Sequence, residues 1–301
     1  MNVIKPVTVD DTVLLSSTVP ETDYAVWNSV TAYAINAYCI MTTGVHRIYQ
    51  CLVANTNFAP NLNTAGTTPK WLDCGPTNQR AMFDSFVNTR TTGTGTLTVV
   101  LQGSGFVSGI GLFGLQGSVL NIKISVGGLT VYDITQSLDG TIRADSYSWF
   151  WEPWRQKETI VVTNLPPYLS PTITITIING SSGVVACGMC AIGSTRSIGI
   201  AQNGTGFGLT DYSGIITDTF GNTTFIKRGN SRLLNLELQF KASELETFDQ
   251  TMRDLTSIPC VWQATDSDTY QFMTTFGYYP DMIAMVQSGY GTCSLSIRGI
   301  I

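Results

Sequence analysis

The chain has 301 residues, of which 43% are hydrophobic, only 12% are charged and 29 are glycine. This length suits two or three domains, and the composition favours short strands joined by tight turns over disorder. A net charge of −5 argues against the dense basic surface that nucleic acid or an anionic membrane requires, so we expect no nucleic-acid partner.

Residues 1–21 are expected to form an N-terminal arm. They lack the basic segment, apolar run and small-residue cleavage site of an export signal, so we expect cytoplasmic synthesis without a signal peptide. The most apolar long stretch, Phe106–Val126, is interrupted by glycines and by Lys123. It therefore predicts strands and turns, and we expect no membrane insertion.

The first predicted domain covers residues 22–76 and contains a hairpin. The alternating runs AYAINAYCIM and HRIYQCLVA flank Thr42–Gly44, as in two strands joined by a turn. A turn centred near Gly44 and Val45 would place Cys39 opposite Cys51. Synthesis in a cytoplasm favours reduced thiols packed as small apolar groups, and the odd total of seven cysteines supports no regular disulfide framework.

Aromatic residues recur through this domain, together with Asn55 and Pro60. Their order resembles the small chitin-binding type of carbohydrate-binding module, although that family has Gly-Asp where this chain has Asn36 and Ala37. The resemblance implies that carbohydrate is bound by Trp27, Tyr33, Tyr49 and Trp71. Exposed rings can stack on the apolar face of a sugar. The alternative is that Trp27 and Trp71 are buried and staple a module too small for another core.

Residues 77–198 predict an antiparallel β-sandwich, because strand-like runs follow one another between turn residues. These runs are TLTVVLQG, FVSGIGLFGL, SVLNIKISVGG, LTVYDI, ETIVVTNL, TITITIING and VVACGMCAIG. Their order is similar to that of the galactose-binding-like jelly roll. The segment GPTNQRAMFDS, directly after a chitin-binding-like module, also resembles the middle of many tail proteins of tailed bacteriophages.

Two features of the sandwich segment bear on function. The densest aromatic cluster of the chain contains Tyr147, Trp149, Phe150, Trp151 and Trp154. These rings could form a carbohydrate platform, or they could plug one end of the sandwich or bury against another subunit. Cys187 and Cys190 form a CxxC motif, but residues three apart on a strand face opposite sides, so we expect neither metal nor redox chemistry there.

Residues 199–301 predict an α+β assembly domain. Gly204, Gly206 and Gly208 are not a nucleotide fingerprint, because two strands around a Phe220–Asn222 turn follow them. The only substantial helix is expected within Ser243–Leu255, which begins with a capping box and carries one apolar stripe. Asp266–Asp268 is interpreted as a turn and not as a calcium site. The IKRG segment and the last strand are similar to those of phage tail and baseplate subunits.

The sequence offers little catalytic chemistry. His46 is the only histidine, which excludes triads and the usual zinc hydrolase sites. Glycoside hydrolysis needs only two carboxylates, and the candidates in the sandwich are Asp84, Asp133, Asp139, Asp145 and Glu152. We expect no enzyme activity, no metal and no cofactor.

The predicted fold class is mainly β and multi-domain: a small β module, a jelly-roll-like antiparallel sandwich and a C-terminal antiparallel sheet with one helix. The resemblance implies a structural subunit of a phage virion tail, at the tail tip, baseplate or adaptor. Its implied partners are other tail proteins, copies of itself in a ring, and host surface polysaccharide. The alternatives are a soluble carbohydrate-binding protein and, less favoured, a polysaccharide depolymerase.

Overall fold

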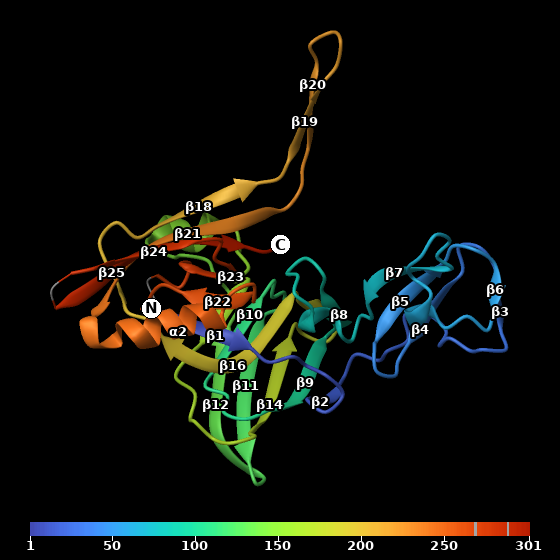
Figure 1. The fold of residues 1–301 in the computed structure, drawn as a ribbon, viewed down its shortest axis with the longest axis horizontal. Helices are drawn as coiled ribbons and strands as arrows, with labels where there is room; N and C mark the ends of the chain where they lie inside the picture. Colours follow the sequence, from blue (N-terminus) through green and yellow to red (C-terminus); the bar gives the residue numbers. More distant parts are fainter. Residues whose placement is uncertain (268–269, 288) are drawn as a thin grey trace.

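The computed structural model describes residues 1–267, 270–287 and 289–301. The protein is mainly β, with 48% of residues in strands and 9% in helices, as the composition predicts. Packed sheets form the body, a small β module lies to its right, and a hairpin projects upward from the body (Figure 1). Among the described helices, none is long and apolar enough to span a membrane.

The middle of the chain folds as a two-layer sandwich. One sheet has the order β12-β11-β14-β9-β2, and strands of a second, larger sheet face it. In β14, Ile173, Ile175 and Ile177 are buried while the threonines between them face outward, which is the alternation expected of a half-buried strand. The strands of the first sheet are β2 (Leu14–Ser17), β9 (Thr96–Gln102), β11 (Val119–Val126), β12 (Leu129–Ser137) and β14 (Thr172–Ile178).

The facing layer is formed by β10 (Gly109–Phe113), β13 (Thr159–Val162) and β16 (Met189–Ser197), with β8 (Thr91–Thr94) and β15 (Val184–Cys187) paired beside it. Gly188 interrupts the extended strand between β15 and β16. The backbone there passes so close to the Val87 carbonyl oxygen that a side chain would clash with it. This break puts Cys187 and Cys190 into the same core. The prediction that they face opposite sides is therefore wrong, although both thiols are free as expected.

The N-terminal residues are built into both sheets. Strand β1 (Asn2–Pro6) lies between β16 and β22 (Cys260–Gln263), antiparallel to both, so Ile4 is opposite Thr195 on one side and Val261 on the other. Both faces of β1 are covered, which explains why Val3 and Ile4 are both buried. One eleven-stranded sheet thus runs from the sandwich into the C-terminal region.

The C-terminal sheet curls around one helix, α2 (Leu245–Asp254). Phe248 and Met252 of α2 pack into a core with the inward residues of the sheet, and the Phe248 ring stacks on Phe240 at 4.5 Å between centroids. The strands are β17 (Ile200–Ala201), β18 (Gly206–Asp211), β21 (Asn230–Lys241), β23 (Thr274–Tyr278), β24 (Met282–Val286) and β25 (Tyr290–Gly299).

The predicted helix is confirmed, and the only other α-helix in the described parts of the chain is α1 (Ser146–Trp151). The predicted capping box is wrong. Ser243 lies in a 3₁₀ turn, Ala242–Glu244, and this turn moves the start of the α-helix past Ser243. The residue before α2 is Glu244, and it makes no side-chain capping bond.

The module of residues 22–76 contains two small sheets, β3-β6 and β4-β5-β7. In its hairpin, Cys39 lies opposite Tyr49, two residues from the predicted partner Cys51. The loop between Met41 and Arg47 centres the turn on Gly44, so the predicted register is wrong, while both cysteines are free as predicted. Its strands are β3 (Ala32–Tyr33), β4 (Tyr38–Met41), β5 (Arg47–Cys51), β6 (Asn55–Thr56) and β7 (Trp71–Pro76).

Candidate functional site

The aromatic residues of the chitin-binding-like pattern gather in the core of the small module. Trp71 is 0% exposed and Tyr49 is 2% exposed, and they pack with Cys39 and Cys51. The Trp71 indole donates to the Phe58 carbonyl oxygen at 2.9 Å. Neither ring offers a face to solvent, so a sugar-stacking role for Tyr49 and Trp71 is wrong. Both side chains belong to the core of the module, and the burial of Trp71 is what the stapling alternative predicts.

Trp27 and Tyr33 are half-buried against the same core. The Tyr33 hydroxyl accepts a hydrogen bond from the Asn28 amide at 2.8 Å, and its ring meets Trp71 edge-on at 5.1 Å. The Trp27 indole nitrogen is buried without a hydrogen-bond partner. These two rings therefore support the fold of the module, and sugar binding by them stays a prediction.

Other rings of the module are exposed. Tyr24 and Tyr38 stack on each other, with centroids 4.9 Å apart, and the Lys70 ammonium group lies 4.7 Å from the centroid of the Phe58 ring. The resemblance did not point to these residues, because they lie outside the aromatic positions of its pattern.

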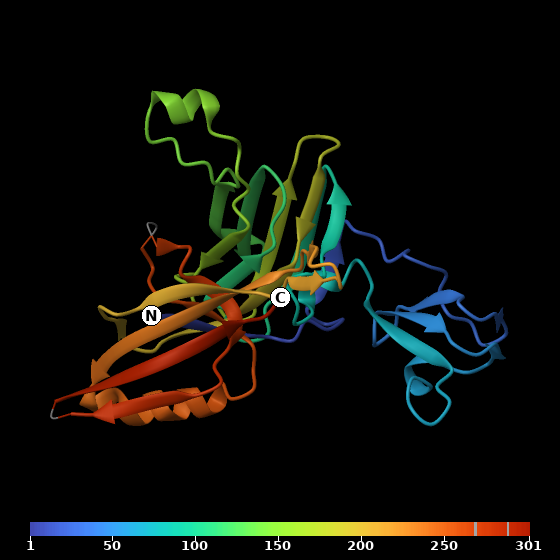
Figure 2. The same cartoon turned by 90° about the horizontal axis from the view of Figure 1, so that it is seen from above.

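The second aromatic cluster forms a projecting loop, which we call the aromatic loop (residues 142–155). Its tip is α1, where Asp145 accepts from the Ser148 amide at 2.7 Å and the Asp145 amide donates to the Ser148 hydroxyl at 3.0 Å. The loop rises away from the sandwich (Figure 2). Of the three roles that the sequence left open, plugging of the sandwich is wrong, because the aromatic side chains are 57–81% exposed: Tyr147, Trp149, Phe150, Trp151 and Trp154.

The candidate carboxylates of the sandwich each bond to near neighbours. Asp139 accepts from the Arg143 guanidinium at 2.8 Å, and Glu152 accepts from Arg155 at 2.9 Å. Asp133 accepts from the Asn121 side chain at 2.7 Å, and Asp84 accepts from the Phe86 amide at 2.7 Å. Together with the capping role of Asp145, these bonds give all five groups local structural partners.

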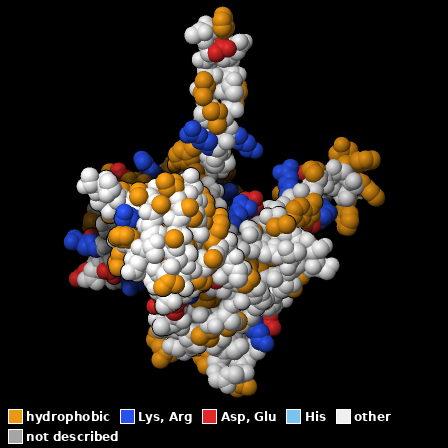
Figure 3. All heavy atoms as spheres, turned by 90° about the vertical axis from the view of Figure 1, so that its right-hand side faces the viewer, with side chains coloured by type: hydrophobic (Ala, Val, Ile, Leu, Met, Phe, Trp, Pro, Cys, Tyr) orange, Lys and Arg blue, Asp and Glu red, His pale blue; other side chains and the backbone are white. Residues whose placement is uncertain are grey.

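A hairpin of β19 (Gly214–Thr217) and β20 (Thr223–Ile226) projects from the body. The predicted turn is confirmed: Asp218 accepts hydrogen bonds from the amides of Phe220 and Asn222, both at 2.8 Å. Ile215 pairs with Phe225, and Ile216 points to the other face. All three are exposed, and Phe220 at the tip is 90% exposed. In Figure 3 this upright projection carries hydrophobic side chains along its length.

The C-terminal sheet ends in two open edges. Within it, β24, β25, β21 and β18 lie side by side, and each neighbouring pair is antiparallel. In the described parts of the chain, β24 pairs only with β25, and β18 pairs only with β21. Strand β24 carries no charged residue, and Ile283, Met285 and Val286 are exposed. Native proteins usually protect edge strands with charges or prolines, and β24 has neither.

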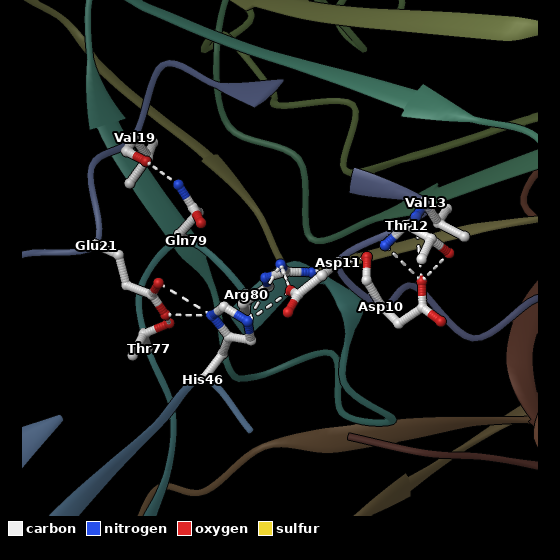
Figure 4. A network of polar contacts seen from close by, with 10 residues as sticks. All are labelled: Asp10, Asp11, Thr12, Val13, Val19, Glu21, His46, Thr77, Gln79 and Arg80. Carbon is white, nitrogen blue, oxygen red and sulfur yellow. Dashed lines mark hydrogen bonds and ion pairs between the residues drawn. The ribbon is translucent and has the colours of Figure 1, made fainter. Parts of the chain in front are cut away.

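A polar network joins the small module to the body (Figure 4). His46 lies between two carboxylates: its Nδ1 is 2.9 Å from Glu21 Oε1 and its Nε2 is 2.6 Å from Asp11 Oδ1. Arg80 also binds Asp11, at 2.5 Å, and the Thr77 hydroxyl donates to Glu21 at 2.6 Å. The His46 side chain is only 14% exposed. Sequence spacing could not reveal this network, since its members come from three separate segments.

The geometry defines what His46 can do. Each ring nitrogen lies within hydrogen-bond distance of a carboxylate oxygen, and Nε2 is also 3.4 Å from Arg80 Nη2. Both nitrogens are therefore engaged by neighbouring side chains. The network is an ionic clamp between arm, module and body. Within the described residues, no group of three or more His, Cys, Asp or Glu is arranged for a metal ion, and Asp268 of the predicted acidic turn lies outside them.

Comparison with protein-family models, with curated proteins and with solved structures found no match to this chain.

Proposed function

We propose that this chain is a non-catalytic structural subunit that assembles with copies of itself, and that the assembly is part of the tail of a phage virion. The assembly part rests on one observation: a four-stranded antiparallel sheet, β24-β25-β21-β18, ends in two open edges of similar length. That the assembly belongs to a phage tail, with other tail proteins as further partners, is what the sequence resemblance implies.

The strand directions support head-to-tail pairing. Because directions alternate across four strands, β24 and β18 run in opposite directions, so β24 of one copy placed beside β18 of the next continues the antiparallel order. This pairing leaves one open edge at each end of the growing assembly. A heterologous contact of this kind produces a closed ring when the rotation between copies closes, and an open filament when it does not.

The remaining surfaces suit the same arrangement. Helix α2 packs on the core-facing side of β21 and β25. On the opposite side, Ser294 donates to Glu237 at 2.8 Å and Ser296 to Asn235 at 3.0 Å, and the exposed Ile283 of β24 lies beside Ser294. The apolar side chains of the β19-β20 hairpin are exposed to solvent in the described structure. An isolated hairpin is only marginally stable in water. We expect a neighbouring copy to cover Ile215, Phe220 and Phe225.

Light scattering after size exclusion tests the assembly. We expect the wild-type chain to form a multimer and Ile283→Asp to shift it to the monomer, because a charge on the edge opposes strand pairing. The matched control is Ile142→Asp on the aromatic loop, which adds the same charge at another exposed position and should leave the multimer intact. Both variants should melt at the wild-type temperature.

A monodisperse wild-type monomer, or a multimer unchanged by Ile283→Asp, would contradict edge pairing. The tail assignment needs its own test: mass spectrometry of purified virions from the cells that encode the chain should detect it in tails. Detection only in the soluble fraction would favour the alternative of a free carbohydrate-binding protein.

A further inference from the structure

A cleft of about 500 Å³ lies at the base of the aromatic loop. Its walls come from three separated segments: the two stems of the loop (139–141 and 156–159), the start of β21, and residues 271–272 before β23. None of these segments belongs to the small module, and the cleft is not part of the open edges of the C-terminal sheet.

Arg232 is the unusual residue of this cleft. It shares the alternation of Leu234 and Leu236, so it lies on the inner, core-facing side of β21, where it is half-buried. Its side chain forms no ion pair or hydrogen bond with the residues that the structure describes, and burial lowers the pKa of its guanidinium group. A partly desolvated, unpaired cation is unfavourable in the free protein. Such a group is suited to a partner that comes from outside.

The charges around Arg232 favour an anion. Asp139 is already engaged by Arg143 at 2.8 Å and by the Thr141 amide at 2.9 Å. Lys157 also lines the cleft and has no ion-pair partner among the described residues, whereas Glu158 is the one carboxylate there without a cation. Among the described residues that line the cleft, two cations without an ion-pair partner, Arg232 and Lys157, thus accompany one such carboxylate, Glu158.

We propose that this cleft binds an acidic saccharide, with the sugar carboxylate on Arg232 and Lys157. A guanidinium binds a carboxylate with two parallel hydrogen bonds, and Glu158 can accept from ring hydroxyls. The exposed Phe272 ring supplies the apolar surface on which a sugar face stacks. Neighbouring sugars of a longer chain would meet the exposed rings of the aromatic loop, which rises directly from the two stems. The net charge of −5 disfavours a nucleic acid as the anion.

Calorimetric titration of the full-length protein tests this proposal with a matched pair of probes, trigalacturonic acid and its methyl ester. The two differ in charge but keep the same hydroxyls. We expect the acid to bind at millimolar concentration or better and the ester to bind at least about tenfold more weakly. Arg232→Gln should abolish binding of the acid and Phe272→Ala should weaken it. Arg228→Gln removes an exposed charge outside the cleft and should bind as wild type.

Thermal unfolding separates binding from structure. Arg232→Gln should melt at or above the wild-type temperature, because it removes a desolvated cation, whereas a structural Arg232 would lower it. Equal binding of acid and ester, unchanged binding by Arg232→Gln, or no binding of the acid would overturn the proposal. Polyglutamate binding as tightly as trigalacturonate would replace the saccharide with an acidic peptide. The proposal does not rest on assembly, so light scattering leaves it unaffected.

Discussion

Asp139 determines how firmly the aromatic loop is held. Its carboxylate accepts from the Thr141 amide and from Arg143, and the Thr141 hydroxyl in turn accepts from the Arg155 amide at 3.0 Å. Arg143 also covers the Trp149 ring, with its guanidinium carbon 5.3 Å from the ring centroid. Asp139 thus holds both Thr141, which contacts the second stem, and Arg143, which covers the ring. Hydrogen bonds from Thr141 and Arg143 lower the pKa of Asp139 to about 2.

This lowered pKa predicts acid loosening of the loop base. A carboxyl whose pKa is lower in the folded state than its ordinary value of 3.8 stabilises the fold above that value. Its contribution is lost as the pH falls through about 2. Hydrogen exchange at the Thr141 amide, corrected for the intrinsic rate, should therefore accelerate only at strongly acidic pH. Asp139→Asn should show fast exchange already at neutral pH, and Asp133→Asn should not. Equal exchange in all three proteins would disprove the role of Asp139.

Among the elements, the small module depends on very few buried side chains. Four buried residues, Cys39, Tyr49, Cys51 and Trp71, form its core, with partial cover from Trp27 and Tyr33. A domain with so small a core has little reserve of stability. The module is accordingly the part of the chain most sensitive to a single large-to-small substitution.

Trp71→Ala should unfold the module. Removing a core tryptophan costs about 3 to 5 kcal/mol, and here it also leaves the Phe58 carbonyl without its donor. Denaturant unfolding should show an early transition for the module, while the sandwich unfolds at the wild-type concentration. Leu72→Ala, the neighbouring exposed residue, serves as the control and should cost little. A single unchanged transition for Trp71→Ala would contradict this view of the core.

Individual strands and the helix were predictable, because the alternation of apolar and polar residues along a strand and the apolar stripe along a helix depend only on residues close together in the sequence. The strand TITITII and the stripe through Phe248 and Met252 are examples, and both formed as predicted. Pairing between distant segments was not predictable, and β1 between β16 and β22 shows why: Ile4 lies opposite Thr195 and Val261, which are 191 and 257 residues further along the chain. The six-residue helix α1 is too short to show a stripe. The environment of Arg232 depends on three segments, so no local pattern reports it.

At the scale of the whole molecule, the orientation of the small module depends on the clamp around His46. Arm residues Asp11 and Glu21 hold the imidazole from both sides, and Arg80 from the body forms an ion pair with Asp11. The chain passes between module and body in two places, before and after residues 22–76, and the clamp ties both passages together (Figure 4).

His46→Gln should free the module. A glutamine amide presents an oxygen on one side and an NH₂ group on the other, and its oxygen cannot donate to a carboxylate, so it cannot replace both imidazole contacts. X-ray scattering should then show a larger maximum dimension, while the melting temperature of the body stays unchanged. Arg47→Gln is the matched control, since it breaks an ion pair with Asp73 that lies within the module. Identical scattering from His46→Gln and wild type would mean that the clamp does not fix the orientation.

The position of β1 also has a consequence for the order in which this molecule can be completed. The ribosome makes residues 2–6 well before their partners Gly193–Ser197 and Val261–Gln263. The nascent chain must therefore carry an unpaired apolar strand until those partners emerge, in a form that any other exposed strand could capture. Long sequence separations of this kind also slow folding. The pairing of β1 can be completed only after β22 has been made, so maturation of the body should depend on chaperones that shield β1 until then.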